Sequence, residues 1–259
     1  MKKLAFLLYG IIAYVIFFGT FLYAVGFVSA LIVPKHIDSV PQSPLGYALL
    51  VNAALLTLFA LQHSVMARPA FKRWWTRFVP EPIERSTYVL LASLCLLLLF
   101  WYWQPMGGVI WSVESQTARV VLQSLCLTGF GIVLISTFLI NHFDLFGLRQ
   151  VWLNFIGKRY EALPFRTPFF YKYVRHPLYL GFIIAFWATP VMTAAHLFFA
   201  IMTTAYMLTA IQFEENDLTK HFGEKYAEYK RSAPMLIPFS NSFRNKAVNA
   251  SPKAESIRK

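Results

Sequence analysis

Two long runs without charged side chains constrain the fold of this sequence more than any other feature. The first covers residues 4–33, and the second covers residues 178–213, which is 36 residues. An α-helix rises 1.5 Å per residue, so about 20 apolar residues cross a bilayer core of roughly 30 Å. Only 14% of the 259 residues are charged, against about 25% in soluble domains. The chain is therefore expected to be an all-α integral membrane protein.

Four amino-terminal transmembrane helices are expected before the second run. They occupy residues 4–33, 45–66, 86–104 and 117–140. The first lacks the short apolar core and the cleavage site of a signal peptide, so it is expected to remain in the protein. The segment 68–85 between the second and third helices carries basic residues with Trp74 and Trp75, which is typical of an interfacial loop.

The run 178–213 is too long for one membrane helix, because 36 residues of helix measure about 54 Å. Pro190 lies near its middle and removes a backbone donor, so the run is expected to fold as a hairpin broken near Pro190. With this hairpin, all Lys and Arg residues except Lys35 and Arg119 lie on one side of the membrane. The positive-inside rule then makes the protein multi-pass, with both termini cytoplasmic.

The net charge of +12 follows from this topology, because the basic residues lie between apolar runs and form no soluble basic face. No nucleic-acid partner is expected. Cys95 and Cys126 lie at different depths of their helices, so they are expected to be unlinked. No metal is expected either, because His63, His142 and His176 form no close pair along the sequence.

A cluster of polar residues is expected where the two arms of the hairpin meet on the cytoplasmic side. Residues 175–179 open the hairpin, and Glu214 and Glu215 close it. Polar side chains near membrane depth are costly, so such a cluster is a candidate functional site.

The residues of this cluster carry a resemblance to a known superfamily. The motif Arg175-His176-Pro177-Leu178-Tyr179-Leu180-Gly181 is followed by Glu214-Glu215, then by Phe222-Gly223 with Tyr226 and Tyr229. This ordered set resembles the carboxyl-terminal signature of the isoprenylcysteine carboxyl methyltransferases and phospholipid methyltransferases. The resemblance implies S-adenosyl-L-methionine as methyl donor, bound between the hairpin and the tail on the cytoplasmic side.

Three further segments resemble the bacterial methanethiol S-methyltransferases over nearly the full length of the chain. They are residues 62–68, 84–88 and 141–150. This resemblance implies conversion of methanethiol to dimethyl sulfide in the bacterial inner membrane, with a small thiol and the lipid bilayer as partners. The first two segments are also similar to the NnrU-type membrane proteins.

Donor-binding roles follow for the residues of the signature. Arg175 and His176 are expected to hold the donor's carboxylate, and Glu214 or Glu215 to accept hydrogen bonds from its amine or ribose. The remaining expected donor-binding residues are Tyr179, Tyr226 and Tyr229, which stack or form hydrogen bonds, Leu180, and Gly181, which lets the ligand approach the backbone.

The acceptor must react as a thiolate, and a thiol with a pKa of about 8.5 or higher benefits from a nearby base. His142 is the expected base, with Asp144 orienting it. Asn141 and Arg149 complete the expected catalytic segment.

The expected organisation is one membrane methyltransferase domain over residues 1–240, with its donor-binding part at about 141–240, and a flexible tail over 241–259. The oligomeric state stays open. One alternative is the same fold acting on a prenylcysteine carboxylate or a lipid. Another is a non-enzymatic NnrU-like accessory protein or a transporter. Transporters often contain broken helices in two repeated halves, and this chain shows one broken segment.

Overall fold

The computed structural model describes residues 1–238, so the expected tail at 241–259 lies outside the described residues. The elements, in chain order, are α1 (Lys2–Ser29), α2 (Leu45–Ala67), α3 (Pro69–Trp75), α4 (Glu81–Tyr102), β1 (Val109–Ser112), α5 (Gln116–Ile140), α6 (His142–Leu145), α7 (Leu148–Phe155), the 3-10 helix η1 (Phe169–Lys172), α8 (Pro177–Trp187), β2 (Val191–Thr193), α9 (Ala194–Phe222) and α10 (Glu224–Ser232).

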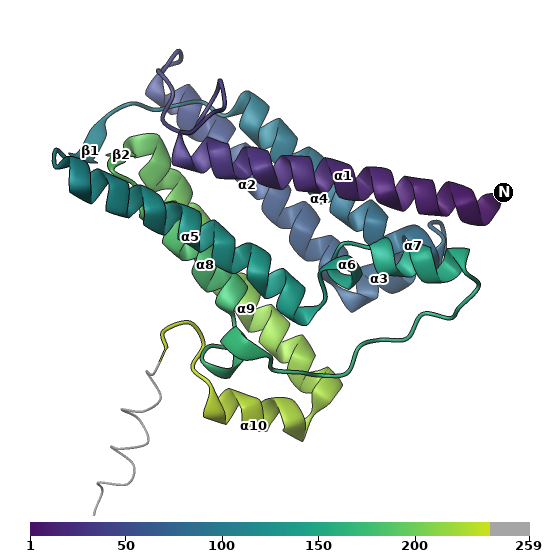
Figure 1. Cartoon of the computed structure of the whole chain (residues 1–259). Helices are drawn as coiled ribbons and strands as arrows, with labels where there is room; N and C mark the ends of the chain where they lie inside the picture. Colours follow the sequence, from purple (N-terminus) through teal and green to yellow (C-terminus); the bar gives the residue numbers. More distant parts are fainter. Residues whose placement is uncertain (239–259) are drawn as a thin grey trace, which may run out of the picture.

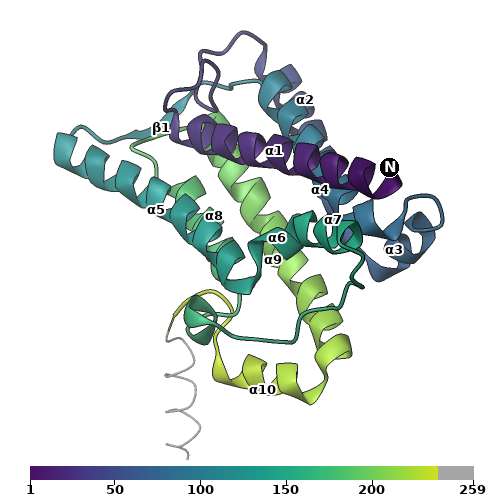
Figure 2. The same ribbon diagram turned by 45° about the vertical axis from the view of Figure 1, so that its right-hand side comes forward.

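Five helices within residues 1–238 are long and apolar enough to cross a membrane, namely α1, α2, α4, α5 and α9. The prediction of an all-α integral membrane protein is confirmed. The long helices lie roughly along one direction, and α10 lies across the far end of α9 (Figures 1 and 2). Proline marks the start of two of them, since α2 follows Pro44 and α4 follows Pro80.

The hairpin is present, but its arms are unequal. The first arm, α8, has 11 residues and a length of about 16 Å, so it does not cross the bilayer core alone. The helix ends at Trp187, three residues before Pro190, because a proline disfavours helical backbone in the residue before it and cannot donate to the preceding turn. The second arm, α9, has 29 residues.

A small β-sheet closes the turn of the hairpin at the end of the molecule opposite α10. Strands β1 and β2 pair antiparallel, with Val109 opposite Thr193 and Ser112 opposite Val191. The Thr193 side chain also caps α9 by accepting from the backbone N–H of His196. The His196 ring in turn lies 3.0 Å from an Asp38 oxygen, which ties the 30–44 loop to the same turn.

The α5 and α8 helices touch through glycine. A Cβ added at Gly129 would lie 2.6 Å from the Gly181 carbonyl oxygen, and one at Gly181 would lie 2.7 Å from the Gly129 carbonyl oxygen. Two glycines thus allow the backbones to approach closely, as in other membrane helix pairs. A buried aromatic core packs between the long helices. It includes Phe27 of α1, Phe130 of α5 and Phe199 of α9.

Candidate active site

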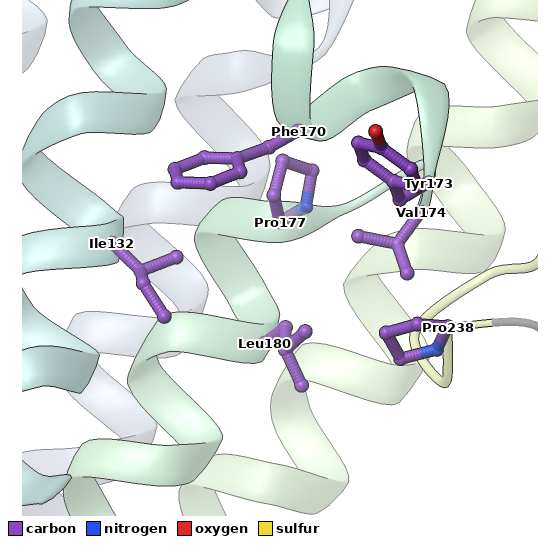
Figure 3. A pocket seen from close by; sticks show the side chains of 7 residues that line it. All are labelled: Ile132, Phe170, Tyr173, Val174, Pro177, Leu180 and Pro238. Carbon is purple, nitrogen blue, oxygen red and sulfur yellow. The ribbon is translucent and has the colours of Figure 1, made fainter.

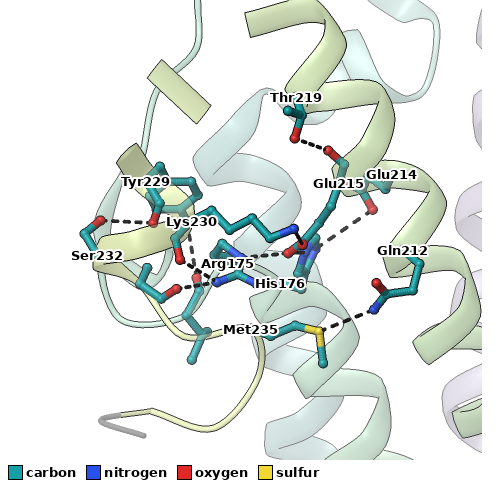
Figure 4. Close-up of polar contacts among 12 residues, drawn as sticks. Arg175, His176, Gln212, Glu214, Glu215, Thr219, Tyr229, Lys230, Ser232 and Met235 are labelled. Carbon is teal, nitrogen blue, oxygen red and sulfur yellow. Dashed lines mark hydrogen bonds and ion pairs between the residues drawn. The ribbon is translucent and has the colours of Figure 1, made fainter. Parts of the chain in front are cut away.

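The two arms of the hairpin meet at a buried ion pair (Figure 4). Arg175 precedes α8, and its Nε donates to Oε1 of Glu215 on α9 at 2.7 Å. The two side chains are only 8% and 3% exposed. His176 Nε2 lies 3.1 Å from the same Oε1, and Lys230 Nζ of α10 lies 2.8 Å from Oε2. The prediction that residues 175–179 lie close to Glu214 and Glu215 is confirmed. We refer to this region as the hairpin mouth.

Glu214 differs from Glu215 in its surroundings. Its Oε2 accepts from the Tyr179 hydroxyl at 3.1 Å and lies 3.9 Å from His176 Nδ1. Its side chain is 44% exposed, whereas Glu215 is enclosed by three partners of its own chain. Glu215 therefore holds the hairpin mouth together, and Glu214 is the carboxylate with room for a further partner.

The segment after α10 lies along the start of the hairpin. The backbone N–H of Arg175 donates to the Pro234 carbonyl at 2.9 Å, and that of His176 donates to the Met235 carbonyl at 3.2 Å. Arg175 Nη1 also donates to the Ala233 carbonyl. The buried Arg175 is thus hydrogen-bonded both to Glu215 on α9 and to the segment after α10. This segment covers the hairpin mouth.

Tyr226 and Tyr229 lie on α10 and face the mouth in different ways. Tyr229 donates to the Tyr171 carbonyl at 2.5 Å. Tyr226 is 1% exposed, and its hydroxyl has no hydrogen-bond partner within residues 1–238. Burial, together with the negative charge of Glu215, raises the pKa of Tyr226 above its usual value, so the phenol keeps its proton. An unpartnered buried hydroxyl beside a charged cluster is a group to which a polar ligand can bind.

Leu180 and Gly181 are placed differently from the rest of the signature. Gly181 faces Gly129 of α5, so the expectation that it admits a ligand to the backbone is wrong, because neighbouring backbone fills that space. Leu180 lines an apolar cavity of about 330 Å³ (Figure 3). The other lining residues are Ile132, Phe170, Tyr173, Val174, Pro177 and Pro238.

The expected catalytic segment forms a local network at the end of α5. Asn141 accepts from the backbone N–H of Asp144 at 3.0 Å and so caps α6. Asp144 pairs with Arg149 at 2.8 Å and accepts from the Tyr160 hydroxyl at 3.4 Å. These contacts are local, since they join residues 141–149 to one another and to the nearby Tyr160.

His142 is 2% exposed and is surrounded by aromatic side chains. The Phe138 ring stacks on the His142 ring, with the ring centroids 4.1 Å apart. Its Nδ1 lies 2.8 Å from the Thr137 hydroxyl, and its Nε2 lies 2.9 Å from the Tyr14 hydroxyl. Burial lowers the pKa of His142. The expectation that Asp144 orients this ring is therefore wrong, because Thr137 and Tyr14 occupy both ring nitrogens.

A second polar cluster, which the sequence did not predict, joins α2, α4 and α9. The Tyr88 hydroxyl lies 2.9 Å from His63 Nδ1 and 3.1 Å from His63 Nε2. The Ser64 hydroxyl lies 3.1 Å from that of Tyr206. Tyr206 lies on α9, eight residues before Glu214 of the hairpin mouth. We call His63, Ser64, Tyr88 and Tyr206 the hydroxyl cluster. In the sequence, His63, Ser64 and Tyr88 belong to the segments 62–68 and 84–88 that carry the family resemblance, whereas Tyr206 lies in an apolar run without such a signal.

A candidate metal site was sought in the part of the chain that the structure describes. Within residues 1–238, no three His, Cys, Asp or Glu side chains gather as a set that holds a metal ion. Cys95 and Cys126 are both free.

Comparisons with known proteins show which family the chain belongs to. The family model for phospholipid methyltransferases matches residues 120–225, which include Arg175, His176, Glu214 and Glu215 of the hairpin mouth. The chain is 57% identical over 233 residues to the methanethiol S-methyltransferase of Crocosphaera subtropica, covering 90% of this chain and 91% of that protein. It is 54% identical over 239 residues to the methanethiol S-methyltransferase of Mycobacterium tuberculosis, covering 92% and 98%.

A third relative, methanethiol S-methyltransferase 1 of Bradyrhizobium diazoefficiens, is 55% identical over 241 residues, covering 93% of this chain and 84% of that protein. No solved structure matches the chain. Identity above one half over nearly the whole of both chains decides the family. The chain belongs to the methanethiol S-methyltransferase family of membrane enzymes.

Proposed function

We propose that this protein transfers the methyl group of S-adenosyl-L-methionine to methanethiol, giving dimethyl sulfide. The observation that carries the proposal is the hairpin mouth, where a buried Arg175–Glu215 pair leaves Glu214 half exposed and the Tyr226 hydroxyl without a partner. The names of the relatives support the choice of acceptor.

The mouth suits a donor that carries a carboxylate, an amine and ribose hydroxyls. We assign the donor's carboxylate to Arg175 and His176, as the resemblance implies. A charge-assisted hydrogen bond to this carboxylate would replace one of the contacts that Arg175 now makes with Glu215 and the Ala233 carbonyl. Glu214 accepts from the amine or a ribose hydroxyl, and the Tyr226 phenol donates to the ligand. Tyr179 and Tyr229 position these groups through their bonds to Glu214 and to the Tyr171 carbonyl.

The apolar cavity beside Leu180 is assigned to the adenine ring of the donor. Its volume of about 330 Å³ lies at the lower end of the range for small-molecule pockets. Phe170 offers an aromatic face, and Leu180 belongs to the same signature as Arg175. The cavity and the mouth together then hold the two ends of one molecule.

For proton removal we propose His63 in place of His142. The ring of His63 belongs to the hydroxyl cluster, whose Tyr206 lies on the same helix as Glu214, whereas His142 contacts α1 and α5 and holds the 141–150 segment in place. The thiol gives its proton to the Tyr88 hydroxyl, which passes its own proton to the His63 ring nitrogen that it contacts, and a sulfur lone pair forms the new bond to the methyl carbon. The pair of electrons of the broken bond remains on the donor's sulfur, and the imidazolium returns its proton to water.

The topology is proposed from charge. We infer that residues 1–240 form one domain in the inner membrane of a bacterium, with both termini and the hairpin mouth cytoplasmic. The support is that, among residues 1–238, Lys35 and Arg119 are the only Lys or Arg residues at the β1–β2 end. A cytoplasmic mouth gives direct access to a donor made in the cytoplasm.

An acceptor panel tests the proposed function. Purified protein receives methyl-labelled donor and, separately, methanethiol, a prenylcysteine and a phospholipid. Label in dimethyl sulfide supports the proposal. Label only in the prenylcysteine or the lipid favours the alternative acceptor, and no transfer to any of the three favours a non-enzymatic accessory role.

A further inference from the structure

Arg68 is the last residue of the segment 62–68, and it directly follows the end of α2 at Ala67. Its Nε donates to the Ser64 carbonyl at 3.2 Å. The last four carbonyls of a helix lack a partner within the helix, and basic side chains near the carboxyl end can bind them. The Arg68 side chain therefore stabilises the end of α2 at Ser64, the residue that follows His63.

The guanidinium group of Arg68 also contacts α9. Its Nη1 lies 2.9 Å from Oδ2 of Asp217. Its Cζ lies over the Phe213 ring, 5.5 Å from the ring centroid, which is the geometry of a cation–π contact. Phe213 directly precedes Glu214 of the hairpin mouth. One side chain thus contacts the neighbour of the proposed base on α2 and the neighbour of the donor-binding carboxylate on α9.

The spacing along α9 places these contacts on the face of the helix that meets α2. Successive residues of an α-helix are rotated by about 100°. Phe213 and Asp217 therefore lie within about 20° of the direction of Tyr206, whose hydroxyl contacts that of Ser64 on α2. Glu215 lies about 180° from Tyr206, on the side of the buried ion pair. Glu214 lies about 80° from Tyr206 and so between these two sides. The position of α2 against α9 thus affects the distance between the base and the donor.

We propose that Arg68 is a positioning residue that holds the proposed base, His63, in place relative to the donor site at Glu214. This inference rests on the proposed function. Methyl transfer needs close alignment of the reacting groups, and a misplacement of about 1 Å can lower a rate about 100-fold. The Arg68 and Asp217 side chains are 36% and 39% exposed, and ion pairs of this kind contribute little to stability. A loss of turnover without a loss of stability therefore distinguishes positioning from a role in folding.

Arg68→Gln in the purified full-length protein tests this, because it removes the cation that makes all three contacts. With methanethiol at pH 7, kcat is expected to fall at least tenfold, while the melting temperature and the affinity for S-adenosylhomocysteine stay unchanged. The loss is expected to shrink as the pH approaches the pKa of the thiol, because the solution then supplies the thiolate. Arg77→Gln is the matched control and is expected to keep the wild-type kcat, because Arg77 is exposed in the loop after α3.

A double substitution tests whether Arg68 acts through His63. Effects of residues that act as a unit are not additive. In a protein that already carries His63→Ala, Arg68→Gln is therefore expected to lower kcat less than twofold. An equal loss with and without His63 overturns the inference. A loss that is constant from pH 7 to pH 10, weaker donor binding, or an unchanged kcat in Arg68→Gln also overturns it.

The wild-type protein separates this inference from the proposed function. If it methylates methanethiol while Arg68→Gln fails the tests above, the inference is overturned and the proposed function stands. If it transfers no methyl group to methanethiol, both are overturned. Should Arg68→Gln not fold, as seen by its melting temperature, Asp217→Asn decides, because it removes the charge that holds Arg68 on α9. A loss of kcat of at least threefold is then expected, and an unchanged kcat overturns the inference.

Discussion

Arg175 and Glu215 lie 40 positions apart in the sequence, yet their side chains share a 2.7 Å hydrogen bond inside the protein. The pair joins the beginning of α8 to the carboxyl-terminal part of α9. Removing one partner would leave the other buried and unpaired, which costs about 3–5 kcal/mol in comparable pairs. Substituting either residue therefore mixes effects on folding with effects on binding, and the neighbouring Glu214 is the better probe.

We predict that Glu214→Gln weakens binding of S-adenosylhomocysteine at least tenfold without lowering the melting temperature. The reason is that the Glu214 carboxylate is half exposed and makes its one hydrogen bond to Tyr179. Calorimetry with the detergent-solubilised protein measures the affinity. Glu224→Gln is the control, because Glu224 lies exposed on α10 and pairs with Arg231. Equal affinity in both variants would remove Glu214 from the donor site.

Tyr226→Phe and Tyr229→Phe are expected to behave in opposite ways. The Tyr226 hydroxyl is buried without a partner among the described residues, so its removal should leave stability unchanged or slightly higher. The same change should weaken donor binding. Tyr229→Phe loses the bond to the Tyr171 carbonyl and should cost about 0.5–1.5 kcal/mol of stability. A Tyr226→Phe variant with normal donor affinity would argue against a ligand at that hydroxyl.

Gly181→Ala is predicted to destabilise the protein by roughly 1–3 kcal/mol, because the added Cβ would overlap the α5 backbone at Gly129. Thermal melting in detergent measures this. Gly131→Ala serves as the control, since a Cβ at Gly131 meets nothing within 4 Å. Normal melting of Gly181→Ala combined with loss of donor binding would restore the ligand role that the structure denies to this glycine.

His63→Ala is predicted to lower turnover by about 10² to 10⁴ at pH 7, the usual share of a general base. The loss should shrink as the pH approaches the pKa of the thiol, because the solution then supplies the thiolate. His142→Gln should keep the wild-type pH profile and lose stability, since its ring fills the shell of Phe138 and Tyr14. Turnover of His63→Ala that is reduced equally from pH 7 to pH 10 would contradict the assignment, as would loss of the pH profile in His142→Gln.

The hairpin and its mouth could be predicted because both depend on local properties of the sequence. The length of the uncharged run 178–213 exceeds a membrane span, and Pro190 fixes where it breaks. A hairpin returns the chain to the side of the membrane where it began, which favours contact between residues 175–179 and Glu214 even though the two arms have 11 and 29 residues. The helical spans follow from the same measure of apolar length.

The contacts between different helices could not be predicted in this way. Tyr88 and Tyr206 lie inside apolar runs, and nothing in one sequence gives the rotation of α4 against α9. Gly181 is a glycine in a motif, and the sequence does not say whether it faces a ligand or α5. The pairing of Lys230 with Glu215 depends on the turn at Gly223, where the backbone reverses with a positive φ of 58°.

The most direct test of the account is the product formed from a deuterated methyl donor. The purified protein is incubated with S-adenosyl-L-methionine that carries a CD₃ group and with methanethiol, and the headspace gas is analysed by mass spectrometry. The account predicts dimethyl sulfide three mass units heavier than the unlabelled compound, formed in equal amount to S-adenosylhomocysteine. Formation of S-adenosylhomocysteine without heavy dimethyl sulfide, or no reaction in protein that binds the donor, would contradict it.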